Sequence, residues 1–282
     1  MTAFVVFVVL VSYVLGVSLG YGTSWMWMAV LFSVFSSFIS YYWGDKMVLA
    51  MSGARPADRK RDFDFFTVAE NLSIAAGIPK PKLYVIDDTA MNAFATGRDP
   101  AHAVVCATTG ILQRLERREL EGVIAHELSH VKNFDTRLMA VVAVLVGTVA
   151  FLADMFMRSL WWGGGRKNRD DDNGLGQIML VVGIILAIIT PILATLIQLS
   201  LSRKREFLAD ASGANLTRYP EGLARALEKL SNDKEVLEAA TNATAHLYIT
   251  NPFKGKQFAA WFSGLFDTHP PIVERIRILR AI

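Results

Sequence analysis

Residues 120–130 read Leu-Glu-Gly-Val-Ile-Ala-His-Glu-Leu-Ser-His, and this stretch carries the strongest structural and chemical signal of the chain. The pattern predicts a helix over residues 116–133. Because positions i and i+4 of a helix share one face, His126 and His130 can reach a single ion. Glu127 projects beside them, where it can take a proton from a water on that ion. The alternative is a pair of surface histidines with a helix-capping glutamate.

Zn²⁺ is the natural occupant of such a site, since catalytic zinc takes three nitrogen or oxygen ligands from the protein and leaves a position for water. Residues 202–213 offer a third ligand, because Glu206 and Asp210 lie four residues apart on one predicted helical face. Glu206 would bind the ion, and Asp210 would hold the far nitrogen of a ligand histidine. The alternative is a solvated helix on which Arg203, Arg205 and Glu206 are surface charges.

Apolar residues gather in long segments. Hydrophobic residues make up 52% of the 282 residues and charged residues 20%, and the mean hydropathy is +0.34. This composition excludes intrinsic disorder. The apolar surface that it implies is larger than one soluble core of this size needs to bury. A helix of about 20 residues spans the hydrocarbon core of a bilayer, which is roughly 30 Å thick. We therefore expect a mainly α membrane protein with four hydrophobic helices, over residues 3–20, 25–43, 138–157 and 178–201.

Two counts exclude whole classes of protein. A single cysteine, Cys106, excludes a disulfide framework and any multi-cysteine metal cluster, and we expect it to be a small buried strand residue. The net charge of +3 is too small to indicate a nucleic-acid-binding protein, so we expect no nucleic-acid partner.

The mixed-charge blocks between the apolar segments predict a folded α+β unit in two pieces. Helices are expected over 62–76, 221–230 and 272–279, and short strands over 83–86 and 103–106. The resulting division is an N-terminal transmembrane hairpin, a first catalytic part, a second transmembrane hairpin and a second catalytic part, over 1–43, 44–137, 138–201 and 202–282.

The metal ligands constrain the membrane topology. One ion can join His126 and His130 to Glu206 only if the chain between them crosses the bilayer an even number of times or not at all. Lysines and arginines then flank one face next to the apolar segments, at positions that include 46, 55, 59–61, 137 and 203–205. By the positive-inside rule this face is cytoplasmic, although the loop over 158–177 also carries basic residues.

The chain resembles the HtpX heat-shock membrane metalloproteases, to which the CAAX prenyl proteases are distantly similar. The resemblance is carried by four motifs: His126-Glu127-x-x-His130, the segment from Ser202 to Asp210, Asn92-Ala93-Phe94-Ala95-Thr96-Gly97, and Thr268-His269-Pro270-Pro271. It covers essentially the whole chain. It implies a zincin-like (gluzincin) α+β catalytic domain in the cytoplasmic membrane.

The resemblance also implies an activity, which is hydrolysis of peptide bonds in damaged or misfolded membrane proteins or unfolded polypeptides. One Zn²⁺ per chain would be held by His126, His130 and Glu206, with Glu127 as the general base and Asp210 behind the ligands. His269 and Arg275 correspond to residues thought to stabilise the oxyanion.

The sequence leaves two interpretations of Asn92 open. It is either a residue that hydrogen bonds to the main chain of an extended substrate at a strand edge, or part of a plain turn. Two alternative functions also remain open, a narrow-specificity processing protease and a non-catalytic membrane scaffold with a structural metal. Intact Glu127 argues against the scaffold, since a structural zinc site needs no general base.

Overall fold

A four-stranded sheet lies at the centre of the computed structural model, which describes residues 6, 24–142, 203–241, 244–250, 252 and 270–282. Its strands are β1 (Arg55–Pro56), β2 (Lys82–Ile86), β3 (Ala93–Thr96) and β4 (Val104–Thr108), in the order β1-β2-β4-β3. β2 and β4 are parallel, β1 is antiparallel to β2, and β3 is antiparallel to β4. β3 is therefore an edge strand.

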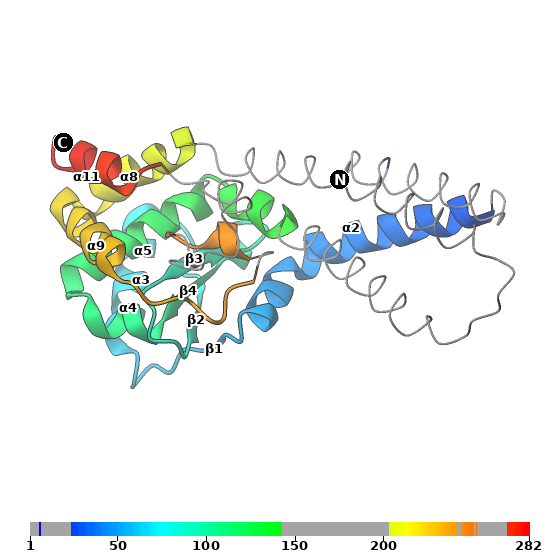
Figure 1. Cartoon of the computed structure of the whole chain (residues 1–282), viewed down its shortest axis with the longest axis horizontal. Coiled ribbons are helices and arrows are strands. Elements are labelled where there is room, and N and C mark those ends of the chain that lie inside the picture. Colours follow the sequence, from blue (N-terminus) through cyan, green and yellow to red (C-terminus); the bar gives the residue numbers. More distant parts are fainter. Residues whose placement is uncertain (1–5, 7–23, 143–202, 242–243, 251, 253–269) are drawn as a thin grey trace, which may run out of the picture.

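Helices surround this sheet (Figure 1). The α-helices are α2 (Ser24–Met51), α3 (Phe63–Ala76), α4 (Thr109–Arg114), α5 (Arg117–Lys132), α8 (Arg203–Thr217), α9 (Pro220–Asn232) and α11 (Ile272–Leu279), and the 3₁₀ turns are η1 (Pro100–His102) and η2 (Ala245–Leu247). α5 packs against α3 and β3 and also against α8 and α9. α2 extends away from the sheet (Figure 1).

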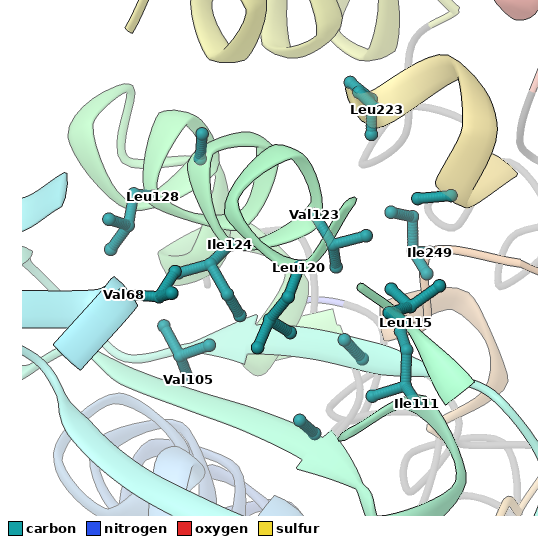
Figure 2. Close-up of a cluster of buried hydrophobic side chains, with 14 of the residues drawn as sticks. Val68, Val105, Ile111, Leu115, Leu120, Val123, Ile124, Leu128, Leu223 and Ile249 are labelled. Atoms are coloured by element: carbon teal, nitrogen blue, oxygen red, sulfur yellow. The ribbon is translucent and has the colours of Figure 1, made fainter. Parts of the chain in front are cut away.

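Helix α5 forms the centre of the main hydrophobic core. It begins with a capping box, in which the Glu119 side chain accepts a hydrogen bond of 2.8 Å from the Glu116 backbone N–H. Its apolar side chains point toward β4, α3 and α9, as Figure 2 shows for Leu120, Val123, Ile124, Leu128 and their neighbours Val105, Val68 and Leu223. α5 is thus buried along most of its length, and its two histidines are held on a rigid element.

The expected elements of the α+β unit are present. The helices predicted over 62–76, 116–133, 221–230 and 272–279 correspond to α3, α5, α9 and α11, and the two predicted strands correspond to β2 and β4. Cys106 is buried in β4, as predicted. The prediction did not include β1 and β3. β3 has only four residues, Ala-Phe-Ala-Thr, and just one of them is β-branched, so its sequence carries a weaker strand signal than β4.

Helix α5 does not run continuously into the third apolar segment. It ends at Lys132, a turn follows in which Phe134 has a φ of 60°, and a new helical stretch covers 135–142. Bulky residues such as phenylalanine rarely adopt this left-handed backbone conformation, and here it interrupts the helix and changes the direction of the chain. The turn lies directly between the second histidine of α5 and the expected membrane segment.

The four expected membrane helices are not confirmed. The segments over 3–20 (apart from residue 6), 143–157 and 178–201 lie outside the described residues. The segment over 25–43 lies in α2, but within the described residues no helix combines the length and the apolar character that crossing a membrane requires. The division of the chain at residues 43, 137 and 201 therefore stays a prediction.

A close contact between α5 and α9 supplies a test of the packing. A Cβ atom at Gly122 would lie 2.6 Å from the backbone nitrogen of Leu223, which is too close for a side chain. Replacing glycine by alanine inside a helix normally stabilises a protein by roughly 0.5–1 kcal/mol. We expect Gly122→Ala to destabilise instead, by about 1–3 kcal/mol, because α9 must move away.

The measurement is the free energy of unfolding of the full chain in detergent. Glu121→Ala is the matched control, because its side chain is 21% exposed and makes only surface ion pairs with Arg117 and Arg118. It should change stability by no more than about 0.5 kcal/mol. A stabilising effect of Gly122→Ala would contradict the close helix contact.

Candidate metal centre and active site

Three potential ligand atoms converge between α5 and α8. His126 Nε2 lies 3.2 Å from His130 Nε2 and 3.7 Å from Glu206 Oε2, and His130 Nε2 lies 3.4 Å from Glu206 Oε1. All three side chains are buried, with exposed fractions of 1–5%. The structure thus brings together the two histidines of one predicted motif and the glutamate of another.

The nearest-atom distances are close to the ligand spacing around a tetrahedral metal ion, and with one ligand atom from each residue the three atoms lie within 4.8 Å of one another. Bonds of about 2.0–2.2 Å to nitrogen and oxygen place neighbouring ligand atoms of a tetrahedron about 3.3–3.5 Å apart. Two imidazoles and one carboxylate are also a donor set typical of zinc. His126, His130 and Glu206 are the group of metal-binding side chains that stands out among the described residues. The chain therefore presents a site whose shape and donor chemistry fit Zn²⁺.

The electrostatics of the site also favour a cation. Burial lowers the pKa of His130, but its hydrogen bonds to Asp135 and Glu206 outweigh burial and raise that pKa to about 10. The surroundings therefore stabilise a positive charge at this imidazole, and a metal ion would supply the same charge. Burial lowers the pKa of His126, which favours the neutral form that binds a metal ion.

Asp210 lies behind His126. Its Oδ1 is 2.9 Å from His126 Nδ1, and Arg275 donates to both oxygens of the same carboxylate over 2.7 and 2.8 Å. Burial raises the pKa of Asp210, but the charge and hydrogen bonds of Arg275 outweigh burial and lower it to about 2. The ionised carboxylate accepts the Nδ1 hydrogen of His126 and leaves Nε2 directed at the site.

Glu127 lies beside the ligands. It is 3% exposed, and burial raises its pKa to about 7. It lines a small cavity of about 10 Å³ together with the three ligand residues and with Ala95, Met139, Leu247 and Ile249. A carboxylate with a pKa near neutrality in such a cavity can both accept and return a proton near pH 7.

A glycine allows α8 to approach α5 at this point. A Cβ atom at Gly213 would lie 3.1 Å from the backbone nitrogen of His126, tighter than an ordinary contact. Glu206 and Asp210 occupy the same face of α8, one turn apart, as their spacing predicted. The close approach therefore lets Glu206 reach the ligand atoms of α5 while Asp210 reaches the back of His126.

Of the two residues expected to contact an oxyanion, the structure describes only Arg275. His269 lies outside the described residues. Arg275 is fully buried, and its Nη1 lies 3.5 Å from Glu206 Oε2 while the rest of its guanidinium binds Asp210. It does not contribute to the lining of the small cavity among the described residues. Arg275 thus lies behind the ligand residues, and its contact with an oxyanion stays a prediction.

Asn92 lies at the start of β3 and is 2% exposed. Its amide nitrogen donates to the Thr250 carbonyl over 3.0 Å, and its carbonyl oxygen accepts from the Ala93 N–H over 3.1 Å. The Ile249 N–H in turn donates to the Ala93 carbonyl over 3.0 Å. Asn92 therefore attaches the segment over 248–250 to the edge of the sheet, and its predicted contact with a substrate remains untested.

Asp135 is a neighbour of the site that the sequence analysis did not identify. Its Oδ2 lies 3.1 Å from His130 Nδ1, and its other oxygen accepts a hydrogen bond from Arg205. The only sequence signal was an aspartate shortly after the second histidine. Residues five positions apart do not face each other on a helix, so this spacing gave no prediction.

Comparison with known proteins agrees with this geometry. A family model described as "Peptidase family M48" matches residues 59–282. A "Protease HtpX homolog" from Caldanaerobacter subterraneus subsp. tengcongensis is 48% identical over 253 residues, or 89% of this chain and 83% of that protein. A protein of the same name from Dictyoglomus thermophilum is 48% identical over 255 residues, or 90% of this chain and 81% of that protein.

The crystal structure of S. mikatae Ste24p is similar in fold, with a TM-score of 0.51 at 18% sequence identity. The alignment covers 92% of this chain and 59% of the Ste24p chain, so this chain spans less than two thirds of the Ste24p length. The family match and the close relatives agree on one class of enzyme. The chain therefore belongs to peptidase family M48 and is a metalloprotease, an enzyme that hydrolyses peptide bonds.

Proposed function

We propose that this protein is a zinc endopeptidase of the cytoplasmic membrane that cleaves damaged or misfolded membrane proteins and unfolded polypeptides. His126, His130 and Glu206 would hold one Zn²⁺ per chain. The observation that carries the proposal is the convergence of these three side chains, within 3.7 Å of one another, beside the buried carboxylate of Glu127. The similarity to proteases named HtpX homologues supports the same conclusion.

A bound Zn²⁺ would polarise the scissile carbonyl and make a nearby water more acidic. In the proposed reaction Glu127 accepts a proton from the attacking water and later delivers it to the leaving amine. Asp210 keeps His126 in the tautomer whose Nε2 faces the site, and Arg275 keeps Asp210 ionised. His269 and Arg275 are the proposed hydrogen-bond donors to the oxyanion.

We expect an extended substrate to lie along the outer edge of β3, with Asn92 at the start of that edge. The segment over 248–250 now bonds to the first residue of β3, and Leu247 and Ile249 line the small cavity. A cavity of about 10 Å³ accommodates no more than about one water molecule. We therefore expect Leu247 and Ile249 to move aside when a peptide enters.

The proposed membrane location rests on the apolar segments of the sequence and on the basic residues that flank them. With Glu206 joined to the histidines of α5, both parts of the catalytic unit lie on one side of the bilayer. The basic flanks make this side cytoplasmic. We expect the nearness of the site to the membrane to favour substrates in or emerging from the bilayer.

The two alternative functions receive less support. A non-catalytic scaffold with a structural metal does not fit the assignment to a peptidase family or the buried carboxylate of Glu127. A narrow-specificity processing protease would use the same chemistry, and a comparison of unrelated polypeptide substrates distinguishes it from the broad enzyme proposed here.

Replacing the proposed general base tests the mechanism. We expect Glu127→Gln to lower the rate of casein hydrolysis by about 10²–10⁴-fold, because an amide cannot accept the proton. The full chain is purified in detergent with a chelator to limit self-cleavage, and zinc is added before the assay. Glu121→Gln, on the same helix with surface ion pairs only, is the matched control. Equal hydrolysis by wild type and Glu127→Gln would refute the proposed chemistry.

Metal addition tests the ligand set independently of activity. Zinc added to the chelator-treated protein should raise its free energy of unfolding, by about 2.7 kcal/mol when free zinc is 100 times the dissociation constant. Thermal unfolding of the full chain measures this effect. Glu206→Gln keeps the shape of the side chain but removes the charged ligand, so most of the stabilisation should be lost. An unchanged response in Glu206→Gln would show that zinc binds elsewhere.

A further inference from the structure

The second ligand histidine has a buried partner of its own. His130 Nδ1 lies 3.1 Å from Asp135 Oδ2, and Asp135 is 2% exposed. The other oxygen of Asp135 accepts a hydrogen bond from Arg205 Nη1. The arrangement repeats the one behind His126, where an aspartate contacts the Nδ1 atom and an arginine binds that aspartate. Each imidazole is thus supported by an aspartate–arginine pair.

The turn after α5 makes this contact possible. In a continuous helix a residue five positions after His130 would lie about 140° around the axis from it and would face away. The helix instead ends at Lys132, and Phe134 adopts a φ of 60°. After this turn the Asp135 carboxylate lies against Nδ1 of the His130 ring. The turn therefore both changes the path of the chain and brings Asp135 into contact with a ligand histidine.

Arg205 links the Asp135 carboxylate to helix α8, which carries the third ligand, Glu206. Arg205 immediately precedes Glu206 on α8, whereas Asp135 is the first residue of the helical stretch over 135–142, which leads into the expected membrane hairpin. The ion pair between Asp135 and Arg205 therefore joins the two ends of the long segment that separates the histidines from Glu206. We name this ion pair the clasp.

We propose that Asp135 is a positioning residue of the metal centre, which acts through the clasp on two ligands. Its carboxylate accepts the Nδ1 hydrogen of His130, so that the lone pair of Nε2 faces the ion. Its ion pair with Arg205 holds the start of α8, so that Glu206 meets the same ion. The inference rests on the proposed zinc site, because it concerns how that site is held.

The test measures the zinc dissociation constant of the detergent-purified full chain by competition with a chelator of known affinity. Replacing a residue that orients a metal ligand typically weakens metal binding by about 10–100-fold. We expect this loss in Asp135→Leu, a smaller loss in Asp135→Asn, whose amide oxygen can still accept the Nδ1 hydrogen, and a loss of about tenfold in Arg205→Gln. The visible spectrum of bound Co²⁺ should change in the same order.

Lys204→Gln is the matched control. It removes the same charge from the adjacent, exposed position of α8 and should leave zinc affinity within about twofold of wild type. Thermal unfolding of the metal-free variants identifies any loss of fold. The Arg205 side chain is 49% exposed, so Arg205→Gln decides the question if the Asp135 variants fail to fold.

The outcomes distinguish a failure of this inference from a failure of the proposed function. If wild type binds zinc tightly and Asp135→Leu and Arg205→Gln bind it equally well, the clasp is only structural and the inference is wrong, while the proposed function stands. If the metal-free variants lose stability without any loss of zinc affinity, the inference is likewise wrong. If wild type itself binds no zinc, the proposed function fails and the inference fails with it.

Discussion

The contact between α5 and α8 is the constraint on which the site depends. It holds two imidazoles and one carboxylate within 3.7 Å of one another in the protein interior. The histidines come from one helix and Glu206 from another, and a Cβ atom at Gly213 of α8 would lie only 3.1 Å from the His126 backbone nitrogen. Helix α9 also packs against α5 and contributes to its burial. Donor geometry here is therefore a result of helix packing.

Burial makes the charges of the site dependent on one another. Glu127, Glu206, Asp210 and Asp135 are each at most 3% exposed, and two arginines, Arg275 and Arg205, contact this group. The acidic groups outnumber the arginines, and a cation at the site, either protonated His130 or a metal ion, balances part of that excess. Buried charges are stable only when they are paired or bind a metal. The charge count and the donor geometry thus point to the same kind of occupant.

Much of the site could be predicted because its contacts follow helical periodicity. His126 and His130 share a helix face, and so do Glu206 and Asp210, so the i, i+4 spacing alone placed each pair. Asp135 was missed because its contact depends on the left-handed conformation of Phe134, which no periodic pattern reveals. β3 was missed for a different reason, since its four residues Ala-Phe-Ala-Thr form a shorter run with fewer β-branched residues than Val-Val-Cys-Ala-Thr of β4.

The sequence by itself determined the local chemistry: a helix with two imidazoles and a carboxylate, a second helix with two acids, and an α+β unit around them. The tertiary structure alone decided how these parts meet. It directed Asp135 to His130, enclosed Arg275 behind the ligand residues and bonded Asn92 to the neighbouring backbone of Thr250. The physical reason is that helical periodicity acts over a few residues, whereas contacts between distant segments depend on turns and close packing that many different sequences can produce.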